Sequence, residues 1–83
     1  MTKQTASEAL AQRVADEIRA EMARQRRSAA DLAEYLGITA HTVGRRLNGA
    51  VPFNVIELAS VSVWLGVPIF ELIARATSKA VAA

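Results

Sequence analysis

Few residues in this chain could perform chemistry, and arginines stand out among those that could. The 83 residues include one histidine, His41, and no cysteine. A zinc site built from Cys and His normally needs three or four such ligands, so no metal site is expected. No carboxylates are paired as a general acid and base, and no glycine-rich phosphate loop is present. The sequence therefore predicts no enzyme activity, no cofactor and no small-molecule ligand.

The basic residues are concentrated in one part of the sequence. The net charge of +2 is too small to distinguish a DNA-binding protein from other small domains. Between residues 22 and 49, however, five arginines stand against two acidic residues, whereas the charges balance from residue 50 to 83. A local excess of positive charge is expected where the partner presents phosphates, so it favours a nucleic-acid partner.

The elements that must position these arginines are helices. Leu10, Val14, Ile18 and Met22 recur at every fourth residue, and no segment alternates with period two as a strand would. The pattern predicts an all-α fold in which five short helices surround one core. A flexible arm is expected at residues 1–6, the domain at 7–77 and a tail at 78–83.

Capping residues and glycines divide the chain into these helices. The predicted N-terminal caps are Thr5 with Glu8, Ser28 with Asp31, Thr39 alone, and Asn54 with Glu57. The glycines expected to follow the ends of helices are Gly37, Gly49 and Gly66.

Residues 28–49 carry the most informative pattern, SAADLAEYLGITAHTVGRRLNG. Two short helices are predicted to meet at Gly37, with small Ala33 at their crossing. This arrangement is typical of a helix-turn-helix, whose second helix, here residues 40–48, enters the major groove of DNA.

The same residues resemble the Cro/repressor-type (Xre-like) helix-turn-helix family. A typical member reads G-[IV]-S-x-x-T-[IV]-S-R-x-x-N-G, and this chain has GITAHTVGRRLNG at residues 37–49, with Gly44 where serine is usual. The resemblance covers nearly the whole chain and implies a compact lambda-repressor-like DNA-binding fold. The string TV-x-R-x-LNG also resembles the lac-repressor family, but that family begins with its helix-turn-helix, whereas a long helix precedes the motif here.

Four residues of the third predicted helix are candidate base contacts: Ala40, His41, Gly44 and Arg45. The Arg45 guanidinium matches the O6 and N7 acceptors of guanine, and Ala40 could contact a thymine methyl group. His41 could donate to a base or a phosphate, and Gly44 could permit close approach or reflect tolerated sequence drift. The alternative for Arg45 is a solvated or phosphate-facing side chain.

Seven residues are candidate contacts to the DNA backbone: Arg27, Ser28, Ala29, Thr39, Thr42, Arg46 and Asn48. Ser28 and Ala29 begin the second helix, where free backbone N–H groups commonly meet a phosphate. Capping alone would also explain Thr39, and helix termination would explain Asn48.

The fourth and fifth predicted helices carry more apolar residues than one buried stripe requires. If Val55, Leu58, Val61 and Leu65 face the core, another apolar face remains. The candidate dimer-interface residues on that second face are Ile56, Val63, Trp64 and Phe70. Exposed apolar residues of a small domain are the alternative explanation.

These observations favour a cytoplasmic, sequence-specific transcriptional regulator, of a phage or prophage Cro-like kind, that binds double-stranded operator DNA as a homodimer. No membrane association is expected, because the longest apolar stretch is shorter than a membrane span and is interrupted. The alternative is a protein-interaction or antitoxin-like module whose apolar face on the fourth and fifth helices binds another protein.

Overall fold

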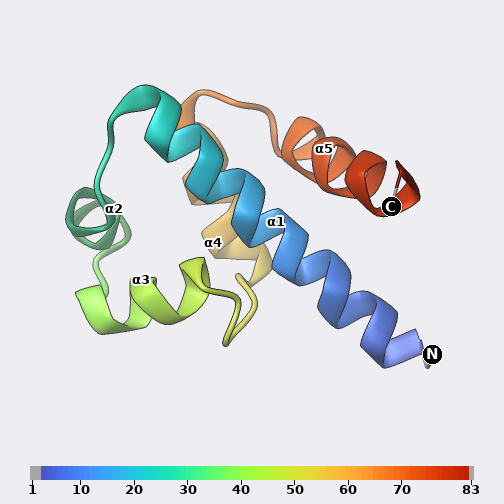
Figure 1. The fold of residues 1–83 in the computed structure, drawn as a ribbon. Helices are drawn as coiled ribbons and strands as arrows, with labels where there is room; N and C mark the ends of the chain where they lie inside the picture. The colour runs from blue at the N-terminus through green and yellow to red at the C-terminus, as the bar shows by residue number, and fades with distance from the viewer. Residues whose placement is uncertain (1–2, 83) are drawn as a thin grey trace.

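The computed structural model describes residues 3–82, with side chains for residues 5–78, and contains five α-helices and no strand within that range. The helices are α1 (Lys3–Gln25), α2 (Ala29–Leu36), α3 (Ala40–Leu47), α4 (Val55–Leu65) and α5 (Ile69–Ala82). The all-α, five-helix architecture predicted from the sequence is thereby confirmed (Figure 1).

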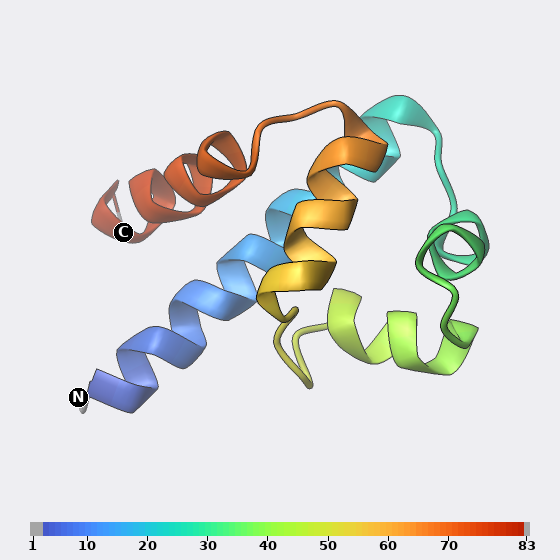
Figure 2. The same ribbon diagram turned by 180° about the vertical axis from the view of Figure 1, so that it is seen from behind.

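The long helix α1 contacts α3, α4 and α5. α5 packs along one part of it, α4 crosses it, and α2 and α3 pack against each other beyond its C-terminal half (Figures 1 and 2). The pair α2–α3 lies at one side of the molecule, where α3 packs on α1 and α2 packs on α4.

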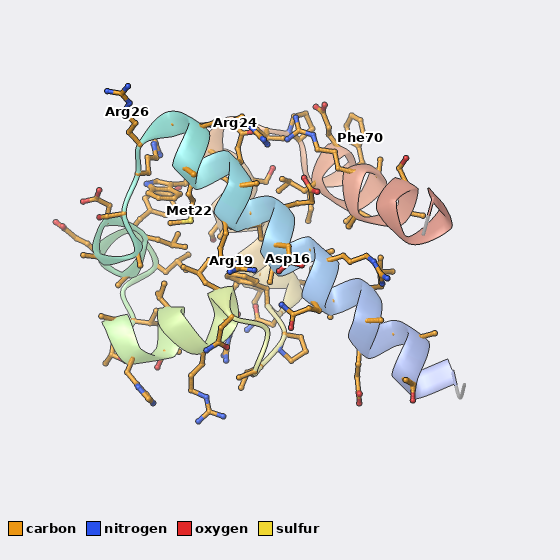
Figure 3. The ribbon with its side chains drawn as sticks, viewed as in Figure 1. Asp16, Arg19, Met22, Arg24, Arg26 and Phe70 are labelled. Carbon is orange, nitrogen blue, oxygen red and sulfur yellow. The ribbon has the colours of Figure 1, made fainter. Side chains whose placement is uncertain are left out.

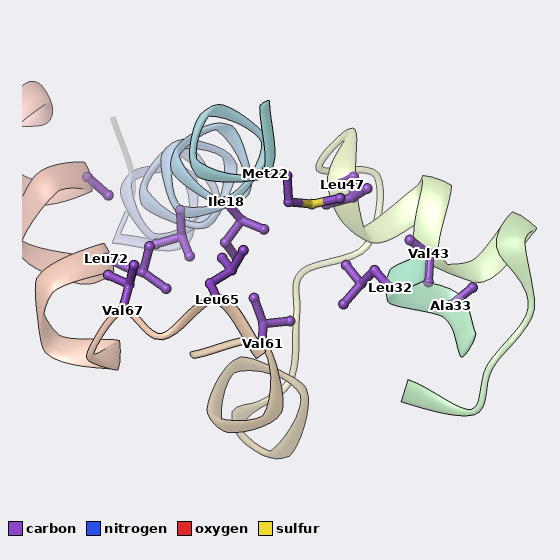
Figure 4. Close-up of a cluster of buried hydrophobic side chains, with 12 residues drawn as sticks. Ile18, Met22, Leu32, Ala33, Val43, Leu47, Val61, Leu65, Val67 and Leu72 are labelled. Atoms are coloured by element: carbon purple, nitrogen blue, oxygen red, sulfur yellow. The ribbon is translucent and has the colours of Figure 1, made fainter. Parts of the chain in front are cut away.

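One core joins all five helices. Its largest fully buried side chains are Ile18, Leu32, Val43, Val61 and Leu72, which come one from each helix (Figure 4). Because each helix contributes to a shared apolar cluster, burial of this area holds α2 and α3 in place on α1 and α4.

The terminal helices are longer than expected. α1 begins at Lys3 rather than near Ser7, so Thr5 lies inside the helix and the expected capping box of Thr5 with Glu8 does not begin it. α5 continues to Ala82, beyond the residue at which the tail was expected to begin. Residues 1–2 and 83 of the expected arm and tail lie outside the described residues.

The predicted internal helix ends are confirmed. The Ser28 and Asn54 side chains each accept a hydrogen bond from the backbone three residues later, at 3.1 and 2.7 Å, and the acidic residue at that position accepts one in return. Gly37 and Gly66 adopt the left-handed conformation after α2 and α4. Local capping chemistry therefore fixes where the short helices start and stop.

Candidate nucleic-acid interface

The predicted helix-turn-helix corresponds to α2 and α3, whose inner faces pack against each other. Leu32 and Ala33 of α2 and Val43 and Leu47 of α3 are buried. Because Val43 and Leu47 lie on one side of α3, the other side of that helix faces away from the core.

The outward side of α3 brings together all four candidate base contacts. Ala40, His41 and Arg45 are exposed, and Gly44 is partly exposed between them. Within residues 5–78, the side chains of His41 and Arg45 form no hydrogen bond or ion pair. Both side chains therefore turn their hydrogen-bonding groups toward solvent.

Thr39 and Thr42 lie at the start of α3. The Thr39 hydroxyl accepts a hydrogen bond from the Thr42 N–H at 3.1 Å and donates to the Thr42 hydroxyl at 2.9 Å. Thr39 is thus the N-terminal cap, as predicted, while the Thr42 hydroxyl keeps its own proton for a further acceptor.

Asn48 ends α3 and also folds the loop that follows. Its backbone N–H donates to the Gly44 carbonyl, and its side-chain Oδ1 accepts from the Ala50 N–H at 2.8 Å. Because the carbonyl oxygen is used within the loop, the exposed amide group retains its two N–H donors. Helix termination and a phosphate contact are compatible at this residue.

At the start of α2, Ser28 is occupied by the capping box with Asp31. The Ala29 and Ala30 backbone N–H groups lie in the first turn, where a helix has no internal acceptor for them. The Asp31 carboxylate lies three residues from the cap, so a phosphate near Ala29 would share the helix N-terminus with a negative charge.

Arg46 points toward α4 rather than outward. Its Nε donates to Glu57 Oε1 at 2.9 Å, and the two side chains are 19% and 14% exposed. Although burial raises the pKa of Glu57, hydrogen bonds from Arg46 and the Asn54 N–H outweigh it and lower that pKa below its usual value. Arg46 therefore has a structural partner that was not predicted, and the ion pair fastens α3 to the first turn of α4.

Arg27 is held against the C-terminal end of α4. Its Nη1 donates to the Trp64 carbonyl at 2.6 Å, and its guanidinium lies 4.5 Å from the centre of the Trp64 ring. Tyr35 lies on the same indole, with ring centres 6.1 Å apart. These three side chains, with Asp31 and Val63, line a shallow groove between α2 and α4.

The arginines at the end of α1 do not share the direction of the α3 face. Arg26 points away from α3, as Figure 3 shows. Arg24 is paired with Glu21 at 3.0 Å. The five arginines that are close in sequence thus do not form one surface in the structure. On the exposed side of α3, Arg45 is the arginine without an ion pair.

The candidate dimer-interface residues divide into two groups. Ile56, Val63 and Phe70 are 79%, 73% and 72% exposed. Trp64 is partly buried and packs on the core and on Arg27, so it offers less surface to a partner than its sequence position indicated. Val55, which was expected to face the core, is 77% exposed because it lies in the first turn of α4, ahead of the buried Val61 and Leu65.

Sequence reasoning missed the ionic partners of the arginines. Arg75 of α5 bonds Glu21 of α1 at 2.9 Å, across 54 residues, and also pairs with Glu71. Hydrogen bonds from Gln25, Arg75 and Arg24 lower the pKa of Glu21 to about 2. The pairs Glu21–Arg24 and Glu71–Arg75 have the helical spacing that a sequence can reveal, as does Asp16–Arg19, whereas the pairs Arg75–Glu21 and Arg46–Glu57 do not.

The described part of the chain offers neither a cluster of metal ligands nor a single membrane-spanning helix. Residues 3–82 contain no group of three or more His, Cys, Asp or Glu side chains that could hold a metal ion. None of the described helices is by itself long and apolar enough to cross a membrane; α4 and residues Ile69–Ser78 of α5 reach that length and apolar composition only as a pair bent by 102°.

Comparison with known proteins gives one match. The family model of the BetR domain matches residues 5–83. No curated protein and no solved structure matches the chain. The BetR domain is a small helical domain of helix-turn-helix type associated with DNA-binding regulators, which agrees with the arrangement of α2 and α3.

Proposed function

Because the chain belongs to the BetR domain family, we propose that it is a sequence-specific DNA-binding transcriptional regulator. The observation that carries this proposal is the outward side of α3. It presents the side chains of His41 and Arg45 one helical turn apart, both exposed and both without a hydrogen bond or ion pair within residues 5–78. A helix-turn-helix places this side of its second helix in the major groove.

Each part of the interface has a role in this proposal. Arg45 donates to the O6 and N7 of a guanine, and His41 donates to a base or a phosphate in the same groove. The Thr42 hydroxyl and the Asn48 amide, at opposite ends of α3, bind backbone phosphates and set the depth and angle of the helix. Arg27 adds positive charge from the site where the Trp64 carbonyl and ring hold it, whereas Glu57 balances the charge of Arg46.

We further propose that the protein acts as a homodimer, as a Cro-like phage or prophage regulator that represses by occupying its operator. A two-fold dimer would present two α3 helices to half-sites about 34 Å apart. The exposed apolar side chains Ile56 and Val63 of α4 and Phe70 of α5 support such a contact. Covering them would remove apolar surface from water, as dimer interfaces do.

The test begins with selection of DNA duplexes from a random library by the purified protein. Arg45→Ala should weaken binding to the enriched duplex by about 1–3 kcal/mol and relax the preference at one base pair. Arg26→Ala is the matched control, because it removes the same charge from a residue that points away from α3. An equal loss for Arg45→Ala on random duplexes would contradict base reading, and failure to enrich any sequence would contradict the proposed function.

A second candidate function uses the same apolar side chains differently. In a protein-interaction or antitoxin-like module, the α4 face around Ile56 and Val63 would bind another protein, with DNA binding secondary or lost. Weak, sequence-independent DNA affinity together with a heterologous protein that co-purifies would favour this candidate over the regulator.

A further inference from the structure

Gly44 is a glycine that the backbone of this protein does not require. Gly37, Gly49 and Gly66 have φ values of 70°, 82° and 69°, which side chains other than glycine rarely adopt. Gly44 lies inside α3 and is not among the residues with positive φ. A glycine in a helix interior weakens the helix relative to alanine, because it retains more freedom in the unfolded chain.

Packing within the molecule does not require a glycine at this position either. A Cβ built on Gly44 would meet no atom within 4 Å among the described residues, apart from the backbone of its own helix. By contrast, a Cβ on Gly49 would lie 1.9 Å from the Gln12 side chain. Internal packing therefore gives no reason for a glycine at position 44, whereas a partner that approaches α3 closely would give one.

The position of Gly44 on α3 indicates what approaches it. With about 3.6 residues per turn, Ala40 and Asn48 lie one turn away on either side, and His41 and Arg45 adjoin it. All four of these residues are exposed. Gly44 thus lies at the edge of the outward side of α3, and its missing side chain leaves a recess beside the longer, donor-bearing side chains of His41, Arg45 and Asn48.

We propose that Gly44 is a specificity-determining residue that admits the 5-methyl group of a thymine in the major groove, an inference that rests on the proposed function. The recess is lined by the Gly44 Cα and has no side-chain donor or acceptor of its own. A guanine or adenine edge facing it would leave polar atoms without a partner, whereas the thymine methyl is the apolar group that a base pair presents in this groove.

The recess at Gly44 also agrees with the proposed base contacts of His41 and Arg45. Arg45 and His41 meet base acceptors more closely the deeper α3 enters the groove. A methyl group added at position 44 would point into the space between the helix and the bases, because nothing in the protein occupies that space. Gly44→Ala should therefore affect both the depth of entry and the fit of the thymine.

The experiment uses the enriched duplex and derivatives in which each thymine in turn is replaced by deoxyuridine, which lacks only the methyl group. For the wild-type protein, one thymine per half-site should give about a fourfold loss of affinity on replacement, the equivalent of one buried methyl group. Gly44→Ala should bind the thymine duplex about tenfold more weakly than the wild type, as expected for overpacking. Its preference for thymine over deoxyuridine at that position should be lost or reversed.

Arg26→Gly is the control, because glycine suits the positive φ of this residue and the Arg26 side chain points away from α3. It should keep the wild-type ratio of thymine to deoxyuridine affinity. The inference is overturned if the wild type binds all deoxyuridine duplexes as tightly as the original, or if Gly44→Ala keeps the wild-type ratio. If no sequence is enriched at all, the proposed function fails and the inference with it, which distinguishes the two failures.

Discussion

At the scale of single residues, Arg26 and Gly44 each lower the free energy of unfolding below what another residue would give at the same position. Arg26 has a φ of 56° at the end of α1, in the place where a helix usually has glycine. The Arg26 and Arg27 N–H groups donate to the Ala23 and Met22 carbonyls. The left-handed turn therefore satisfies the last carbonyls of α1, although Arg26 is not a glycine. The conformational penalty for a side chain in this region is about 1 kcal/mol.

Arg26→Gly should therefore raise the free energy of unfolding. The relief of the left-handed conformation contributes about 1 kcal/mol, and the greater freedom of glycine in the unfolded chain offsets part of it. Gly44→Ala should raise it by a similar amount, since α3 gains helix propensity and no contact is lost. Urea denaturation followed by circular dichroism measures both changes. Gly37→Ala is the control of opposite sign, because it places a side chain at a φ of 70°; a lower stability for Gly44→Ala would show that α3 needs its glycine internally.

The sequence identified the caps at Ser28, Thr39 and Asn54 because capping depends on residues within three positions of each other. It could not identify the partners of Arg27 and Arg46. Those arginines meet Trp64 and Glu57 through the packing of separate helices, and no spacing along the chain encodes such a contact. The same limit explains why Trp64 was placed on a second surface rather than beneath a cation.

At the scale of elements, polar contacts decide how the helices are fastened together. Gln25 donates both to Glu21 and, at 2.8 Å, to the Leu65 carbonyl at the end of α4. Glu21 in turn accepts from Arg75 of α5. One acidic side chain, 12% exposed, therefore links α1 with α5 directly and supports the contact of α1 with α4.

This link predicts an acid-sensitive contribution to stability. The pKa of Glu21 is lowered from 4.5 to about 2 by hydrogen bonds from Gln25, Arg75 and Arg24, so the ionised form favours the folded state. Its contribution is fully present above pH 4.5 and is lost as the pH falls from there toward 2. We expect it to be about 2 kcal/mol, somewhat less than full linkage would give, because Arg24 is exposed.

Glu21→Gln should be less stable than the wild type at neutral pH, and the difference should shrink as the pH falls from 4.5 toward 2. Thermal melts across this range measure it. Glu34→Gln, at an exposed position of α2, is the control that should leave the acid limb unchanged. Parallel acid limbs for Glu21→Gln and the wild type would rule out the contribution.

At the scale of the whole molecule, the proposed DNA-binding surface and the proposed dimer contact are carried by different elements. α3 turns its outward side away from the core, while α4 exposes Ile56 and Val63, seven residues apart and therefore on one side of the helix. This separation allows one copy to bind a partner copy through α4 while α3 remains open to DNA. The helical periodicity revealed surplus apolar residues, but only the packed structure shows that Val63, rather than Trp64, is the more exposed of the two.

Val63→Lys should therefore convert a dimer into a monomer without unfolding the domain, because it places a charge in the apolar contact while leaving the buried core untouched. Light scattering at high protein concentration measures the mass, which for one chain is 8.9 kDa. Ala23→Lys adds the same charge at an exposed position of α1 and should remain dimeric. A wild-type protein with the mass of a single chain would contradict the proposed homodimer, whereas a dimer that persists in Val63→Lys would assign the contact to another face.

If the contact is correct, the monomeric variant should also lose affinity for a duplex with two half-sites far more than for one with a single half-site, because only the dimer engages both sites together.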